Sequence, residues 1–238
     1  MNPNYLWTAW MTIGALGCSA ETDDTGFSGP TIEVSGRVND AVFGNDVPGA
    51  SVCNRWEECV STDGNGHFAH PLVPAEERTF LRVDSQGAAG SLAAFETTSD
   101  PQEIPVLGLA EASYVDGYYF LIDTERVPGT GIVAFSVSNG IDGDGVNVSG
   151  IRVRLDPPAD GPHYGNEIGL PDTERFETGT NGGGLIINVP PGEVELEHIG
   201  LPDGCQTRLG WGGPELLTLP VEADRVTYAR IECADATP

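Results

Sequence analysis

Short runs of β-branched and apolar residues recur along the chain, separated by Gly, Pro, Asn and Asp. Two stretches contain such runs in the same order: the first begins at residues 34–38 and closes at 73–83, and the second begins at 132–137 and closes at 189–199. Runs of this length with alternating apolar positions, bounded by turn-forming residues, are typical of half-buried antiparallel strands. The pattern predicts a mainly β protein made of two tandem antiparallel β-sandwiches.

Turn chemistry in the first stretch supports this interpretation. Pro48 fixes φ at the first central position of a type II turn, and Gly49 supplies a positive φ at the second. The Asp-Gly-Asn-Gly sequence at 63–66 suits a tight hairpin. Asp142 and Asp144 lie in a similar Asp-Gly-Asp-Gly sequence, and their carboxylates are ligands that Ca²⁺ accepts. Neither sequence continues into a full twelve-residue calcium loop, so turns are favoured and calcium at Asp142 and Asp144 is the weaker alternative.

Four elements of the first stretch resemble the carboxypeptidase regulatory-like domain, a transthyretin-like or Ig-like β-sandwich. They are Val-Ser-Gly-Arg-Val at 34–38, Val-Pro-Gly-Ala-Ser-Val at 47–52, Thr-Asp-Gly-Asn-Gly-His-Phe at 62–68, and the Pro-containing turn and strand at 73–83. The resemblance covers residues 31–105. The second stretch, residues 131–235, is similar only in strand order. The resemblance implies seven-stranded sandwiches that act as accessory or surface modules without catalytic residues.

Residues 106–130 interrupt the β pattern. Apolar and aromatic side chains recur there at steps of three and four between Leu107 and Leu121, which predicts an amphipathic helix. Pro105 suits the start of such a helix, whereas Gly117 and the neighbouring aromatic residues leave a pair of strands as the alternative. We expect a short helical connector between the two sandwiches.

The first 18 residues have the features of an export signal. The apolar run at 5–16 is too short to span a bilayer permanently and ends in Ala-Leu-Gly-Cys, which resembles a bacterial lipobox. Cys18 would then carry the lipid, and an ordinary secretory signal cleaved nearby is the alternative. Residues 19–30 are acidic and rich in small residues, which predicts a disordered tether. We expect an outer-membrane lipoprotein of the cell envelope, attached to the membrane through its N-terminal lipid and either periplasmic or surface-exposed.

The five cysteines fit an exported protein. Cys18 stands alone, Cys53 and Cys59 lie in the first stretch, and Cys205 and Cys233 lie in the second, so each sandwich has one candidate disulfide. Each bridge would stabilise its domain by roughly 2–4 kcal/mol and would persist only outside the reducing cytosol. A zinc site is the competing use, but the spacing of Cys53 and Cys59 is too wide for a Cys-x-x-Cys knuckle.

Charge and motif content argue against several classes of function. The chain has 36 acidic and 11 basic residues, all of the latter arginine, and a net charge of -25, which makes nucleic acid an unfavourable partner. It has no Gly-x-Ser-x-Gly elbow, P-loop or His-x-x-Glu zinc pair. We therefore expect no enzyme, no cofactor and no metal site. An iron centre like that of intradiol dioxygenases, in the second sandwich, is a weaker alternative because a close His-x-His pair is missing.

Two loops of the second stretch are candidates for ligand binding. The segment 156–177 is longer than a connection between strands requires, and long loops on a rigid sandwich often carry function. Its candidate residues are His163, Tyr164, Asn166 and Glu167, and Trp211, which lies between two glycines, is a further one. The alternative is solvated loops with an aromatic side chain in the core. We expect a non-catalytic module that binds or spaces a glycan, a peptide or an envelope protein; an accessory domain pair of an extracellular hydrolase is the alternative.

Overall fold

The computed structural model describes residues 29–139 and 146–234 of the chain. Over these residues the protein is mainly β with one short helix. No helix of the described part is long and apolar enough to cross a membrane. The predicted signal peptide with Cys18, nearly all of the predicted tether, and Asp142 and Asp144 lie outside the described residues.

The first half of the molecule, residues 29–109, consists of two small sheets. In one, β1 pairs antiparallel with β4 and parallel with β7 and β8; in the other, β5 pairs antiparallel with both β2 and β6, and β3 pairs with β2. The bounds are β1 (Thr31–Asp40), β2 (Ser51–Cys53), β3 (Cys59–Ser61), β4 (His67–Pro74), β5 (Arg78–Asp84), β6 (Gly90–Glu96), β7 (Gln102–Glu103) and β8 (Leu107–Leu109).

The second half, residues 131–234, repeats these pairings. β9 pairs antiparallel with β13 and parallel with β18, just as β1 pairs with β4 and β8. In the second sheet, β14 lies between β10 and β17, just as β5 lies between β2 and β6. The bounds are β9 (Gly131–Asn139), β10 (Arg152–Asp156), β11 (Asp160–Gly165), β12 (Pro171–Asp172), β13 (Gly183–Val189), β14 (Gly192–Ile199), β15 (Cys205–Leu209), β16 (Trp211–Gly213), β17 (Leu216–Val221) and β18 (Arg225–Cys233).

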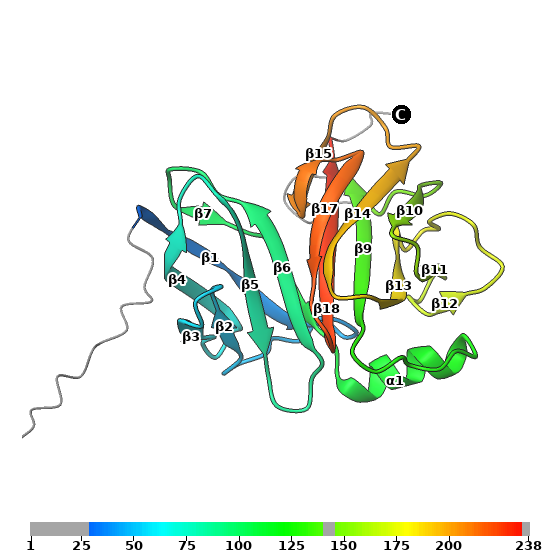
Figure 1. Cartoon of the computed structure of the whole chain (residues 1–238), viewed down its shortest axis with the longest axis horizontal. Helices are drawn as coiled ribbons and strands as arrows, with labels where there is room; N and C mark the ends of the chain where they lie inside the picture. The colour runs from blue at the N-terminus through cyan, green and yellow to red at the C-terminus, as the bar shows by residue number, and fades with distance from the viewer. Residues whose placement is uncertain (1–28, 140–145, 235–238) are drawn as a thin grey trace, which may run out of the picture.

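The two halves are joined by one sheet of ten strands (Figure 1). β18 pairs parallel with β9 on one side and with β6 on the other. The prediction of a mainly β protein is confirmed, whereas that of two tandem antiparallel β-sandwiches is corrected: the sheets of the two halves merge, and several strand pairs are parallel. The physical reason is that β6 and β18 would otherwise each expose a row of unpaired backbone groups, which pairing satisfies.

Each half covers the shared sheet with a smaller sheet of its own, and these two smaller sheets lie on opposite faces of the shared sheet. Along β9, Val133 and Phe135 pack against the sheet β10-β14-β17-β16, whereas Ile132 and Ala134 point to the other face. Along β6, Phe95 packs towards the sheet that contains β1. Because residues paired across neighbouring strands share a face, the β1 sheet lies on the same face as Ile132.

The helix α1 (Ala112–Leu121) is shorter than the connector predicted for residues 106–130, because residues 107–109 form β8 beside β1. Val115 and Tyr119 are its buried side chains, and they pack with Ile132 and Val226 on the shared sheet. The helix thus covers part of the sheet face that the β1 sheet leaves open, as Figure 1 shows at the lower edge of the second half.

Candidate functional site

Trp211 fixes the second half of the molecule to the first. Its side chain is buried, and the indole Nε1 donates hydrogen bonds to the carbonyl oxygens of Thr79 at 3.0 Å and Phe95 at 3.1 Å. The neighbouring amide of Gly210 donates to the carbonyl of Ala94. The prediction of Trp211 as an exposed ligand residue is corrected by this burial: its ring needs an apolar environment and its N–H needs an acceptor, and the junction offers both.

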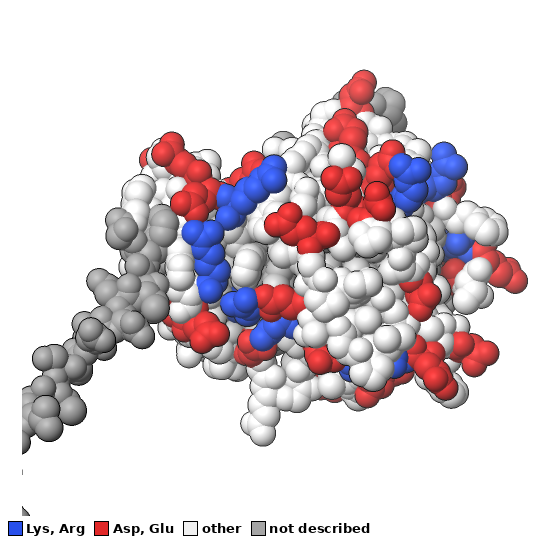
Figure 2. Space-filling model, viewed as in Figure 1, with Lys and Arg blue, Asp and Glu red and all other residues white. Residues whose placement is uncertain are grey.

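Ion pairs close the same junction at its surface. Arg82 of β5 donates to Glu222 at 2.6 Å, and Arg225 of β18 donates to Asp84 at 2.8 Å and lies 3.2 Å from Glu222. The hydrogen bond to Glu222 raises the pKa of the Arg82 guanidinium. Figure 2 shows basic side chains in a row over β5, with acidic side chains beside them. Side chains from both halves therefore hold the junction in one geometry.

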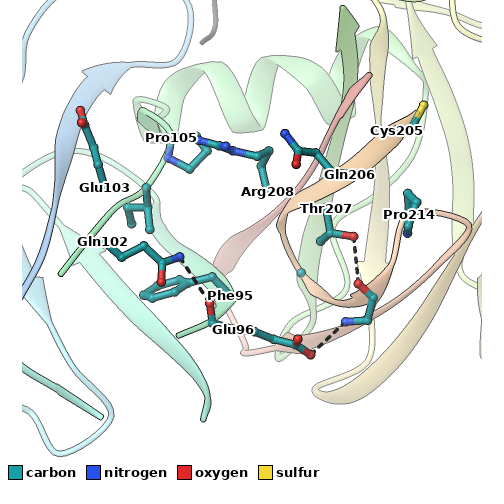
Figure 3. Close-up of a pocket in the computed structure, with 13 residues that line it drawn as sticks. Phe95, Glu96, Gln102, Glu103, Pro105, Cys205, Gln206, Thr207, Arg208 and Pro214 are labelled. Atoms are coloured by element: carbon teal, nitrogen blue, oxygen red, sulfur yellow. Dashed lines mark hydrogen bonds between the residues drawn. The ribbon is translucent and has the colours of Figure 1, made fainter. Parts of the chain in front are cut away.

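A polar cleft of about 470 Å³ opens at the junction, between β6 and β7 of the first half and β15 and β16 of the second (Figure 3). We call it the junction cleft. It is lined by Phe95, Glu96, Gln102, Glu103, Ile104, Pro105, Cys205, Gln206, Thr207, Arg208, Gly210, Gly212 and Pro214.

Three hydrogen bonds fix the walls of the junction cleft. The Gln102 side chain donates to the carbonyl of Glu96 at 3.3 Å, the Glu96 carboxylate accepts from the amide of Gly212 at 3.3 Å, and the Thr207 hydroxyl donates to the carbonyl of Gly212 at 2.9 Å. The dashed lines of Figure 3 mark these bonds. The bond between Glu96 and Gly212 crosses the junction, so both walls are held before any ligand arrives.

Other polar groups of the junction cleft have no partner among the described residues. The carboxamide of Gln206 and the carboxylate of Glu103 form no hydrogen bond there, and the Oε1 atom of Gln102 is buried without a donor. Arg208 lies 3.4 Å from Glu232 through Nε and extends towards Pro105 across the cleft (Figure 3). The cleft thus offers donors, acceptors and charges of both signs to a ligand.

The candidate residues of the loop at 156–177 do not form one site. Tyr164 is 2% exposed; its hydroxyl accepts a hydrogen bond from the amide of Val153 at 2.9 Å, and its ring meets Phe135 edge to face. The prediction of Tyr164 as a ligand contact is corrected, because β11 turns this ring into the core of the second half. Asn166 accepts hydrogen bonds from the amides of Ile168 and Leu170, so its side chain shapes a turn.

His163 and Glu167 point to no common ligand either. His163 is half-buried, which lowers the pKa of its imidazole, and its Nε2 atom is buried without a partner among the described residues. Glu167 is exposed. None of the loop candidates lines the junction cleft. Of the cleft residues, the sequence singled out Cys205 as a disulfide partner and Pro105 as a helix start, but none as a ligand contact. The others belong to no motif and come together only through the tertiary structure.

Both predicted disulfides are confirmed. Cys53 bonds to Cys59 across the paired strands β2 and β3, and Cys205 bonds to Cys233 across β15 and β18. The second bridge ties the strand that carries the cleft residues Gln206 and Arg208 to the central strand of the shared sheet.

Within residues 29–139 and 146–234, no group of three or more His, Cys, Asp or Glu side chains is arranged to hold a metal ion. The buried His198 stands alone: neither ring nitrogen has a hydrogen bond of ordinary geometry, and burial lowers its pKa to about 4. The expectations of no metal, no cofactor and no enzymatic activity stay predictions.

No family model matches the chain, and no curated protein matches it. Among solved structures, the chain is similar to GBS52, the minor pilin of Streptococcus agalactiae, with 12% identity, 87% of this chain and 97% of that chain covered, and a TM-score of 0.32. The chain is also similar to the shaft pilin SpaA of Lactobacillus rhamnosus GG, with 7% identity, 88% of this chain and 99% of that chain covered, and a TM-score of 0.27. A third similar structure is that of a candidate carbohydrate-binding protein of Bacteroides uniformis, with 12% identity, 81% of this chain and 98% of that chain covered, and a TM-score of 0.28. TM-scores this low say nothing about the ligand of this chain.

Proposed function

We propose that the chain is a non-catalytic, exported binding protein that holds an extended peptide in the junction cleft. The observation that carries this proposal is a pair of polar side chains without partners among the described residues, Gln206 and Glu103, beside the guanidinium of Arg208, on walls that are already fixed across the junction. Fixed walls lower the ordering cost of binding, and unpaired groups gain hydrogen bonds from a ligand.

The chemistry of the lining favours a peptide over a glycan. An extended peptide presents alternating amide donors and carbonyl acceptors, which the free carboxamide of Gln206 matches, and its charged side chains or ends can pair with Glu103 or Arg208. Sugars commonly stack on an exposed aromatic ring. The aromatic residue of this lining, Phe95, belongs to the core, where its ring packs inside the first half.

Location in the cell envelope is part of the proposal. Two disulfides support an oxidising compartment, and the lipobox-like sequence supports attachment to the outer membrane through Cys18. The strand pairings found twice in the molecule support the resemblance to carboxypeptidase regulatory-like modules. A mass spectrum of the mature protein isolated from its own cells tests the anchor: we expect an N-terminal peptide that begins at a diacyl- or triacyl-modified Cys18, and an unmodified N-terminus contradicts it.

Selection from a displayed library of random twelve-residue peptides tests the binding function. We expect the disulfide-bonded soluble part, residues 19–238, to enrich a related set of peptides. Gln206→Trp places an indole in the junction cleft and should weaken the selected peptides at least about tenfold. Gln86→Trp makes the same change on an exposed turn and should bind as the parent protein does.

Two results would contradict the proposal. One is that no related peptides are enriched, while an array of neutral and acidic oligosaccharides retains the protein, which would favour a glycan. The other is that selected peptides bind equally well to the Gln206→Trp and Gln86→Trp variants, which would place their site elsewhere.

A further inference from the structure

A second hollow lies beside α1, on the face of the shared sheet opposite the core of the second half. It has a volume of about 360 Å³, and we call it the tyrosine pocket. Strands β9, β13 and β18 form its floor, and α1 and the chain after β1 form its walls. Its lining includes the four tyrosines Tyr114, Tyr118, Tyr119 and Tyr228.

The pocket exists because α1 is too short to cover the sheet face that the β1 sheet leaves open. Ile132 and Ala134 of β9 alternate towards this face, and Val115 and Tyr119 of α1 cover only part of it. Tyr118 donates its hydroxyl to the carbonyl of His163 at 3.3 Å, which ties the helix to β11 on the far side of the pocket. The walls are therefore fixed in the same way as those of the junction cleft.

The lining contains no Asp, Glu, Lys, Arg or His, although the whole chain has a net charge of -25. The Tyr118 hydroxyl is already bonded to His163, whereas the hydroxyls of Ser136 and Tyr228 and the amide nitrogen of Asn181 have no hydrogen-bond partner among the described residues. Asn181 is held in place, because its oxygen accepts from the amide of Gly183 at 3.2 Å and its side chain occupies space that a Cβ at Gly165 would take.

Exposed apolar side chains surround the mouth of the tyrosine pocket. Val42 is 49% exposed and Phe43 is 65% exposed, and the ring of Phe43 meets that of Tyr114 edge to face at 5.7 Å. On the other side, Ile168 is 79% exposed and precedes Gly169 of the lining. An apolar rim around a pocket with a few fixed polar groups marks a place where apolar ligand surface leaves water.

We propose that the tyrosine pocket binds an uncharged aromatic small molecule that carries one or two hydrogen-bonding groups. Ring faces of the tyrosines and the small floor residues Ala134 and Ser136 accept a flat ring. The hydroxyl of Tyr228 and the amide of Asn181 bind its polar groups. An anionic ligand is disfavoured, because the pocket has no cation to pair with it and the surrounding protein is strongly acidic. This site is separate from the junction cleft and from the peptide proposed there.

A pair of fluorescent probes with the same rings tests the charge preference. N-phenyl-1-naphthylamine is uncharged, and 8-anilinonaphthalene-1-sulfonate adds one sulfonate to the same rings. We expect the purified soluble chain to bind one equivalent of the uncharged probe, with enhanced probe emission, at least about tenfold more tightly than the sulfonate. Equal binding of the two probes, or no saturable binding of the uncharged one, would overturn the proposal.

A matched pair of surface variants locates the binding. Val42 on the rim and Val127 after the helix are both 49% exposed, and only Val42 lines the pocket. Val42→Glu should weaken the uncharged probe severalfold, whereas Val127→Glu should leave its affinity unchanged. Both sites are exposed, so both variants should fold. An equal effect of the two substitutions would place the probe outside the pocket.

A larger side chain on the floor sharpens the test. Ser136→Phe should fill the tyrosine pocket and abolish saturable binding, and Ser61→Phe, on the exposed strand β3, is its control. Circular dichroism establishes that both variants are folded. Gln206→Trp in the junction cleft should leave probe binding unchanged, so failure of this proposal and failure of the peptide proposal give different results.

Discussion

The two halves of the molecule have the same strand pairings but cover opposite faces of one sheet. The first half contributes its β2-β5-β6 sheet and covers it with the β1 sheet, whereas the second contributes β13-β9-β18 and covers it with β10-β14-β17-β16. The halves therefore present different layers to the junction. A duplicated pattern in the sequence does not fix how its two copies are joined.

This difference creates both candidate sites. Where β18 leaves β6 and pairs with β15 instead, the halves diverge and the junction cleft opens between them. On the face that the second half leaves without a second sheet, α1 is the cover, and the tyrosine pocket remains beside it. Each proposed ligand thus belongs to a place where the symmetry of the two copies is broken.

The junction is most sharply tested at Trp211. Trp211→Ala removes a buried ring and two hydrogen bonds to the first half, so we expect a loss of about 3–5 kcal/mol in the free energy of unfolding. Urea unfolding followed by circular dichroism measures it. Trp56→Ala, away from the junction in the first half, should cost less than half as much. Equal losses of unfolding free energy in the two variants would show that the contacts of Trp211 at the junction stabilise the protein no more than those of Trp56.

The stabilisation that each disulfide provides can be compared directly between the two halves. Cys205 and Cys233 are separated by 28 residues and Cys53 and Cys59 by 6, so the loop-entropy model gives about 3.6 and about 2.2 kcal/mol of stabilisation, respectively. We expect the double alanine variant of the second pair to unfold at a lower urea concentration than that of the first. The reverse order would mean that strand pairing, rather than loop length, sets the contribution of each bridge.

Buried histidines also distinguish the halves. His70 in the first half bonds through Nε2 to the carbonyl of Glu58, whereas neither ring nitrogen of His198 in the second has a hydrogen bond of ordinary geometry, and burial lowers its pKa to about 4. The unfolded state, with an imidazole pKa of about 6.5, takes up a proton first as the pH falls. The contribution of neutral, buried His198 to the free energy of unfolding should therefore be fully present above about pH 6.5. The free energy of unfolding should fall by up to about 3 kcal/mol between about pH 6.5 and about pH 4.

His198→Leu should remove most of this pH dependence, since the substituted side chain has no proton to gain. His67→Leu, at an exposed position of β4, is the control and should retain the slope of the parent protein. Thermal unfolding at a series of pH values measures both. A slope that survives in His198→Leu would assign the acid sensitivity to other groups.

The smallest effect is expected at the ion pairs of the junction. Arg82→Met removes a partly buried pair with Glu222, and we expect a loss of about 1 kcal/mol that shrinks in high salt. Arg154→Met breaks the more exposed pair with Glu197 inside the second half and should change stability by about 0.5 kcal/mol or less. Equal effects would mean that burial at the junction does not strengthen its ion pairs.

Much of the local structure was predictable, because it depends on neighbours in the sequence. The alternation of Val34, Gly36 and Val38 in β1 predicted a strand with one buried face, and the number and position of the cysteines predicted two bridges. The ligand candidates Tyr164 and Trp211 were wrong for a common reason. Neither the length of the segment around Tyr164 nor the glycines beside Trp211 indicate whether an aromatic ring points to solvent or to a neighbouring layer.

By itself, the sequence determined a β architecture, its duplication and its cross-links, because strand period, turn residues and cysteine placement act over a few residues. Only the tertiary structure decided that β6 and β18 pair, that the two covers lie on opposite faces, and that Gln206 and Gln102 line one cleft. These outcomes depend on which strand edge finds a partner and which apolar face finds a cover. Such choices compare free energies over the whole chain, and no single segment of the sequence contains them.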